Sequence, residues 1–271
     1  MKKILRITMF LLTTVALIGL SSCQKNDVLD SSSLGNASDL QLKKADMNTF
    51  YSPTQPLGNG VMRAWVQVDK MGHPMAVGVN LSEKALMNLP ADPASYVLEL
   101  PKMKGQHFYT HAYVDWNPQG HEPAHVYDVP HFDFHFYIIS SEDRMQIPLD
   151  TSTTVFNTPP DPMYIPDHYM ELPGLVPGMG AHWVDLLSPE FNGSPFTQTM
   201  IWGSYQGHFI FWEPMITIAF LKSHPDVTTP IRQPQAYEMP GWYATDYMVK
   251  YSEHPNQYTV ALVNLQPKGG Q

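Results

Sequence analysis

The chain has 271 residues, 43% of them hydrophobic and only 15% charged, so it contains enough apolar sequence for a large core and is not globally disordered. Its 25 prolines disfavour a helical bundle, and a net charge of −9 without a basic stripe disfavours nucleic-acid binding. The single cysteine excludes an intramolecular disulfide and a cysteine-based metal site.

Residues 1–22 have the pattern of a bacterial lipoprotein signal peptide. Basic residues at positions 2, 3 and 6 precede an apolar run from Ile7 to Leu20, which is too short for a comfortable membrane span. The run ends in the sequence LSSC, which resembles a lipobox with Cys23 at the lipidation position. We expect cleavage before Cys23 and anchoring of its lipidated terminus in a bilayer of the cell envelope. The alternative is an ordinary signal peptide with an incidental cysteine.

The predicted mature chain starts at Cys23 and has 13 basic against 25 acidic residues. Residues 23–49 are polar and include three consecutive serines, so we predict a flexible tether. One folded domain over residues 50–266 and a tail over 267–271 would follow. An aspartate after the cysteine would suggest retention at the inner membrane. Gln24 stands there instead, which favours the outer membrane or cell surface.

The predicted domain begins with a β-hairpin, in which strands 61–68 and 75–80 flank a Gly-Pro-containing turn. Ser82 is expected to cap a short helix over residues 83–89, which Pro90 would end. Four further segments have the composition of strands: residues 96–100, 107–116, 131–139 and 200–204.

The C-terminal part contains a long apolar run, residues 208–221, interrupted by Glu213 and Pro214. It predicts a strand followed by a short helix that starts near Pro214. Residues 245–251 and 257–265 predict a second hairpin, and the Pro- and Gly-rich residues 148–195 predict long ordered loops. The fold class is therefore mainly β, a sandwich or an open barrel-like sheet with a few short helices, and α+β is the second choice.

Six of the twelve histidines lie within residues 107–135, and the sequence HFDFHFY at 131–137 is the most informative part of that stretch. In a strand, His131, Asp133 and His135 share one face and the three phenylalanines share the other. Because residues four apart on a strand are about 13 Å apart, these three side chains cannot hold one ion together. A metal site would therefore need ligands from other segments.

Histidines and carboxylates together suit a divalent ion such as zinc, iron or manganese. The candidate metal ligands are His131, Asp133, His135, His182, His121 and His125. Glu213, a carboxylate in an apolar run, is costly to bury unless it is paired, protonated or metal-bound, and Glu213 and Glu122 are the candidate general bases. A metal-free polar network that fixes the fold is the alternative, and surface histidines without a joint role are the third reading.

The longest motif is DWNPQGHEP at residues 115–123, which continues through PHFDFHFY at 130–137. Together with MGAHW at 179–183 and EPMIT at 213–217, it resembles a bacterial family of secreted or lipoprotein domains of unknown function. The founding member of that family is a thermophile protein controlled by sigma-E, an extracytoplasmic sigma factor, and its anti-sigma factor. The resemblance spans about residues 57–265. It implies one domain and supplies no activity.

We therefore expect a lipid-anchored envelope protein with a His/carboxylate metal site. If the site is catalytic, metal-assisted hydrolysis or hydration is the natural reaction class. The alternative is a non-enzymatic envelope protein that binds a ligand or partner, or responds to stress, and whose histidine cluster is structural. The sequence predicts a lipid bilayer as one partner and no nucleic acid. It leaves open a homo-oligomer and the identity of any small-molecule or protein partner.

Overall fold

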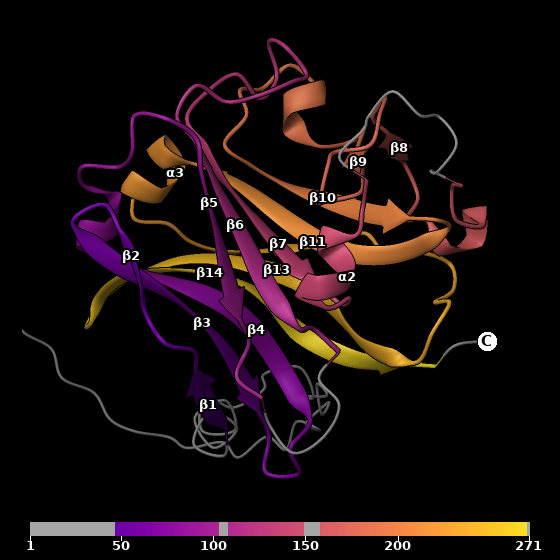
Figure 1. Cartoon of the computed structure of the whole chain (residues 1–271), viewed down its shortest axis with the longest axis horizontal. Coiled ribbons are helices and arrows are strands. Elements are labelled where there is room, and N and C mark those ends of the chain that lie inside the picture. The colour runs from indigo at the N-terminus through magenta and orange to yellow at the C-terminus, as the bar shows by residue number, and fades with distance from the viewer. Residues whose placement is uncertain (1–46, 103–107, 149–157, 270–271) are drawn as a thin grey trace, which may run out of the picture. The chain divides into compact units, whose positions relative to one another are not determined.

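The computed structural model describes residues 47–102, 108–148 and 158–269, which all belong to one compact unit, residues 43–271. Two seven-stranded antiparallel sheets make up most of this unit (Figure 1). The predicted mainly β class is thus confirmed. Cys23, the signal peptide and most of the predicted tether lie outside the described residues. No helix in the described ranges combines the length and hydropathy needed to cross a membrane.

The first sheet combines the start and the end of the unit. Its strands, in spatial order, are β1 (Asn48–Tyr51), β3 (Gly60–Val68), β4 (Pro74–Ser82), β14 (Asn256–Lys268), β13 (Gly241–Glu253) and β12 (Asp226–Pro230), while β2 (Gln55–Leu57) pairs with β3. Both predicted hairpins belong to this sheet, as β3–β4 and as β13–β14, and in the second of them Glu253 pairs with Asn256.

The second sheet is built from the middle of the sequence. Its strands, in spatial order, are β5 (Ala94–Glu99), β6 (His111–Asn117), β7 (His131–Tyr137), β11 (His208–Thr217), β10 (Gln198–Tyr205), β9 (Ala181–Asp185) and β8 (Tyr169–Glu171). The histidine-rich strand β7 therefore lies inside the sheet, between β6 and β11, where both of its edges are hydrogen-bonded.

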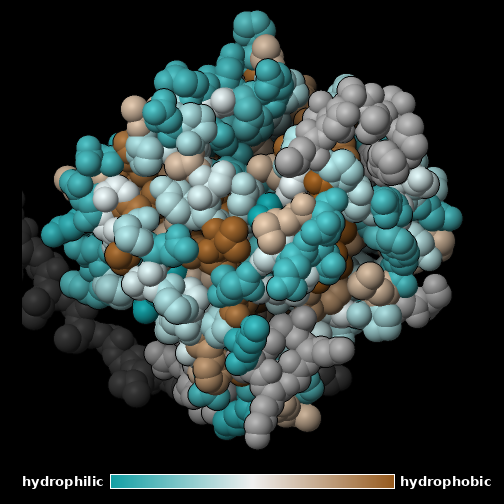
Figure 2. Space-filling model, in the orientation of Figure 1, coloured by the Kyte–Doolittle hydropathy of each residue, from teal (hydrophilic) through white to brown (hydrophobic). Residues whose placement is uncertain are grey.

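The two sheets share one hydrophobic core. Phe132, Phe134 and Phe136 of β7 pack in the same buried cluster as Val77 and Val79 of β4. These phenylalanines alternate with His131, Asp133 and His135, so the inward face of the strand carries the phenylalanines and the outward face carries the histidines and the aspartate. On the side shown in Figure 2, apolar side chains form small areas between polar ones.

Three of the predicted elements are wrong in position or type. The predicted helix over 83–89 is a shorter 3₁₀ turn, η1 (Glu83–Leu86), because Ser82 does not cap it and instead accepts a 3.0 Å hydrogen bond from the backbone of Val61. Pro214 does not start a helix but continues β11 opposite Met200. The helix α3 (Ile218–Lys222) begins later, because the Thr217 side chain caps it.

The third error concerns residues 148–195, which are not all loop. The described part, 158–195, contains β8 and β9 as well as the 3₁₀ turns η2 (Pro162–Tyr164) and η3 (Pro189–Phe191). These strands are short and flanked by Gly and Pro, so their local alternation is weak, and pairing with β10 defines β9. The helix α2 (Ser141–Met145) follows β7.

Candidate metal centre

The outward face of the second sheet carries the predicted histidine and carboxylate residues. His131, Asp133 and His135 project from this face of β7, and all three are almost fully buried beneath loops. The register with β6 places Asp115 directly opposite Asp133. Because the strand repeat separates His131 from His135, the two histidines fall into different groups of side chains, which we call the outer triad and the inner triad.

The inner triad consists of His135 on β7, His182 on β9 and Glu213 on β11. The Nε2 atoms of the two histidines are 3.4 Å apart. Glu213 places Oε1 3.4 Å from Nε2 of His135 and Oε2 3.5 Å from Nε2 of His182. A tetrahedral zinc ion with bonds of 2.0–2.1 Å requires ligand atoms about 3.3–3.4 Å apart, so the three side chains are spaced as the ligands of one ion.

A glycine makes room for this arrangement. The strand β10 separates β11 from β9, and its residue Gly203 lies beside both Phe211 and His182. A Cβ atom at this position would lie 2.1 Å from the ring of Phe211. With no side chain on Gly203, the Phe211 ring packs 5.0 Å, centroid to centroid, from the rings of both His135 and His182. The triad thus has an apolar wall on one side.

The second nitrogen of each inner imidazole faces a backbone carbonyl. Nδ1 of His135 lies 3.3 Å from the carbonyl oxygen of Tyr113, and Nδ1 of His182 lies 3.2 Å from the carbonyl oxygen of Gly180. A carbonyl can only accept a hydrogen bond, so these contacts place the proton on Nδ1 and leave a lone pair on Nε2. Backbone carbonyls orient metal-binding histidines in this way in known metal sites.

Burial determines the charge of the inner triad. It lowers the pKa of His135 to about 3, aided by the neighbouring His182, and lowers the pKa of His182 to about 4. Burial, reinforced by the charges of Asp133 and Asp115, raises the pKa of Glu213 well above its ordinary value. In the metal-free triad, burial therefore favours neutral imidazoles and the protonated form of the carboxyl group.

One carboxyl proton cannot satisfy this triad. Glu213 can donate a single hydrogen bond, whereas the Nε2 lone pairs of both His135 and His182 face it. One lone pair remains without a donor, and a buried unsatisfied polar atom costs about 1–3 kcal/mol. Oε2 of Glu213 likewise has no hydrogen-bond partner. A divalent cation would satisfy all three ligand atoms at once.

The outer triad consists of His121, His131 and Asp133. Nε2 of His121 lies 3.4 Å from Oδ2 of Asp133, and Nε2 of His131 lies 3.1 Å from Oδ1. Burial opposes ionisation of Asp133, but the two imidazoles outweigh it and hold its pKa below the ordinary value. Asn117 donates a 2.6 Å hydrogen bond to Oδ2 of Asp133 and so fixes the carboxylate.

Asp115 lies beside both triads without belonging to either. Its Oδ2 is 3.7 Å from Nδ1 of His135, and its Oδ1 accepts a hydrogen bond from Ser95. Burial and, to a smaller extent, the charge of Asp133 raise the pKa of Asp115 to about 7. Asp115 and Asn117 were not among the predicted site residues, because their place beside the histidines depends on the pairing of β6 with β7. Their position in the motif DWNPQGHEP was the available signal.

A cavity of about 740 Å³ connects the two triads. Members of both triads line it, namely His121 and Asp133 from the outer one and His135, His182 and Glu213 from the inner one. Glu122 also lines it, outside both triads. His125 does not take part: its side chain is 94% exposed, and its nearest charged partner is Asp128. Of the candidate ligands, five are thus brought together with Glu213, and His125 lies apart.

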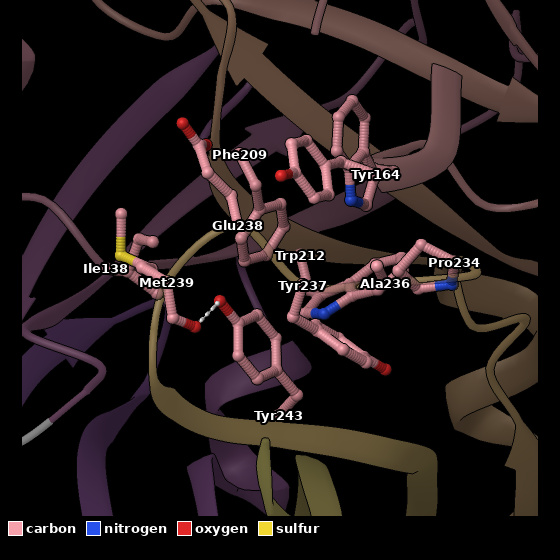
Figure 3. Close-up of a pocket in the computed structure, with 11 residues that line it drawn as sticks. Ile138, Tyr164, Phe209, Trp212, Pro234, Ala236, Tyr237, Glu238, Met239 and Tyr243 are labelled. Carbon is pink, nitrogen blue, oxygen red and sulfur yellow. Dashed lines mark hydrogen bonds between the residues drawn. The ribbon is translucent and has the colours of Figure 1, made fainter. Parts of the chain in front are cut away.

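A second, much smaller pocket of about 20 Å³ has a different character. Aromatic rings, among them Tyr164, Phe209 and Tyr237, surround it (Figure 3). Its carboxylate, Glu238, forms a 2.7 Å ion pair with His208. Neither residue belongs to a group of metal-ligating side chains, so the larger cavity is the better candidate for chemistry.

Comparison with known families gives one match. A family model described as "TTHB210-like: Hypothetical protein TTHB210" matches residues 69–116. The chain is similar to that family over this segment. The match covers β4, β5 and nearly all of β6, includes only the first two residues of the motif at 115–123, and ends before β7. The description supports a family of unknown function. No curated protein and no solved structure matches the chain.

Proposed function

We propose that this chain is a lipid-anchored protein of the cell envelope, held at the outer membrane or cell surface through Cys23, that binds a divalent metal ion at its inner triad. The anchor rests on the signal-peptide pattern and the lipobox-like sequence before Cys23. The metal site rests on one observation. Two imidazole lone pairs and a carboxylate converge at the spacing of a metal's coordination sphere, in a buried place where one proton cannot satisfy them.

We assign zinc, iron or manganese as the ion, because imidazole and carboxylate ligands suit these metals. The three side chains would leave further coordination positions for water. A bound divalent ion acidifies such a water, so metal-assisted hydrolysis or hydration is the reaction class that we propose. Glu213 then acts as a ligand, and Glu122 becomes the candidate general base because it lines the cavity outside both triads.

The walls of the cavity suggest the kind of substrate. Apolar side chains such as Leu172, Val176 and Met179 form part of the lining. Among the described residues, the lining includes no lysine or arginine to bind an anionic group. We therefore propose an uncharged small molecule with an apolar body and one polar group that reaches the ion.

The resemblance over residues 115–137 is to a family whose founding member is under sigma-E control, so we further propose that the protein belongs to an envelope stress response. A rise in its transcript after envelope damage would support this assignment, and a constant level would contradict it. A non-enzymatic stress protein with a purely structural histidine cluster remains the competing hypothesis. The following experiment separates the two.

The test is elemental analysis of the full chain, purified in detergent without a polyhistidine tag or chelator. Wild type should contain near-stoichiometric divalent metal, and His135→Ala should lose metal while its circular dichroism remains that of a folded sheet. His125→Ala, which changes an exposed histidine outside both triads, serves as the matched control and should keep the wild-type metal content. Absence of metal from wild type, together with a lower melting temperature of His135→Ala, would make the cluster structural and refute the proposal.

A further inference from the structure

A second group of ligands faces the same cavity. The inner triad does not use His121, His131 or Asp133, and these three side chains bring their own ligand atoms within 4.8 Å of one another. We infer that the outer triad is a second divalent-cation site, so that the cavity holds two ions rather than one. This inference rests on the proposed function for the first ion and adds a second, separate site.

The first support is that two buried ligand atoms lie close together without a hydrogen bond. Nε2 of His131 and Oδ1 of Asp133 are 3.1 Å apart, yet neither atom has a hydrogen-bond partner. The side chain of His131 is fully buried and that of Asp133 is 6% exposed, so water cannot readily satisfy them. A cation between the two atoms and Nε2 of His121 would satisfy them all.

The second support is that both imidazoles are already oriented. Nδ1 of His131 lies 2.6 Å from the carbonyl oxygen of Val129, and Nδ1 of His121 lies 2.6 Å from that of Glu122. As in the inner triad, these contacts direct Nε2 toward the carboxylate. Asn117 holds the other oxygen of Asp133, which is the kind of supporting hydrogen bond that orients metal ligands.

The third support is the way the loop carrying His121 is fixed. The side chain of His121 is 37% exposed, but its backbone N–H donates a 3.1 Å hydrogen bond to the carbonyl oxygen of Tyr127, which is buried. Gly120 adopts a positive φ of 72°, and a Cβ atom there would lie 2.1 Å from the same oxygen. The loop therefore presents His121 in one place, although no strand carries it.

The two sites use separate ligands and should bind ions with different strengths. No side chain belongs to both triads, and Asp133 and His135 are one strand repeat apart, about 7 Å along β7. Strands alone build the inner triad, whereas a partly exposed loop residue completes the outer one. We expect the inner ion to bind more tightly and the outer ion to exchange more readily.

The experiment is a zinc titration of the chelator-stripped full chain in detergent, with bound ions counted by native mass spectrometry. Wild type and the control His125→Ala should bind two ions, and His121→Ala should bind one. Cobalt titration, followed by visible absorption, gives a second count that does not depend on zinc. Because His121 lies in a loop and is partly exposed, its replacement should leave the fold intact, which circular dichroism checks.

The possible outcomes are distinct. Two ions in wild type and one in His121→Ala support the second site. One ion in wild type, or two in His121→Ala, overturns it. If the single wild-type ion disappears in His135→Ala, the proposed function stands and only the second site fails. If wild type binds no ion, both the proposed function and the second site are refuted.

Discussion

Replacing Glu213 with glutamine separates a metal ligand from a structural residue. The side chain of Glu213 is 2% exposed, and burial together with neighbouring carboxylates raises its pKa well above the ordinary value. In the metal-free protein burial therefore favours its protonated, neutral form, which glutamine resembles. The two side chains have nearly the same shape, so Glu213→Gln should change the stability of the metal-free chain by no more than about 1 kcal/mol.

In the presence of metal, the same substitution should have a much larger effect on stability. At a free ion concentration one hundred times the Kd, binding stabilises the folded state by about 2.7 kcal/mol. For a folded unit of this size, that corresponds to a rise in Tm of roughly 5–11 °C. Loss of residues that merely support a ligand weakens metal binding by about 10- to 100-fold, so loss of an anionic ligand should cost at least about 100-fold. From the inner site, Glu213→Gln would then gain only about 0.4 kcal/mol, or roughly 1 °C, at the same ion concentration.

The assay is thermal unfolding of the full chain in detergent at pH 7.5, first stripped of metal and then with increasing zinc. Glu238→Gln is the matched control, because it neutralises a carboxylate in the smaller pocket and should keep the full zinc-dependent rise. An equal rise in wild type and Glu213→Gln would refute the assignment of Glu213 as a ligand. A wild-type Tm that does not change with zinc concentration, combined with a large loss of stability in metal-free Glu213→Gln, would identify a structural network.

Two further predictions concern pH and the membrane anchor. Several buried groups have shifted pKa values: His111, His135, His182, Asp115 and Glu213. The three histidines have lowered pKa values, so their contribution to stability is complete above about pH 6.5 and is lost on acidification. The two carboxyl groups have raised pKa values, so their contribution falls as pH rises above about 4. The three histidines outnumber the two carboxyl groups, so the metal-free chain should lose stability on acidification below about pH 6.5, and the raised carboxyl pKa values predict that it also weakens above pH 6.5. Denaturant titrations at several pH values measure the free energy of unfolding. A free energy of unfolding that rose steadily on acidification would contradict the prediction. For the anchor, Cys23→Ser should abolish incorporation of a labelled fatty acid and release the chain from membranes, and labelling that persists would exclude lipidation at Cys23.

The alternating pattern of β7 was sufficient to predict much of the site. The alternation of residue types in HFDFHFY, with a period of two, predicts a strand. It assigns the phenylalanines to the core and places His131, Asp133 and His135 on the other face. The same repeat explains why His131 and His135 belong to different triads. These features are local, since they depend only on the geometry of one strand.

Features that depend on pairing between distant segments could not be predicted in the same way. Asp115 reaches the site only because β6 pairs with β7 in a particular register. His182 was a candidate, but its strand β9 was assigned to a loop, because its pairing partner β10 lies further along the chain. The prediction of a helix start at Pro214 was wrong, because proline is common at the first position of a helix but here continues a paired strand.

The choice between a metal site and a structural network depends on a count of donors and acceptors. A network that evolved only to hold the sheet would be expected to match its hydrogen-bond donors with its acceptors, because unmatched buried atoms cost about 1–3 kcal/mol each. In the inner triad two Nε2 lone pairs face a carboxyl group with one proton, and in the outer triad Nε2 of His131 and Oδ1 of Asp133 have no hydrogen-bond partner. Each group therefore leaves ligand atoms without a hydrogen bond at its centre, and backbone carbonyls contact the other nitrogen of each imidazole. A cation corrects the deficit in both places, which is why we favour bound ions over a network stabilised by protons alone.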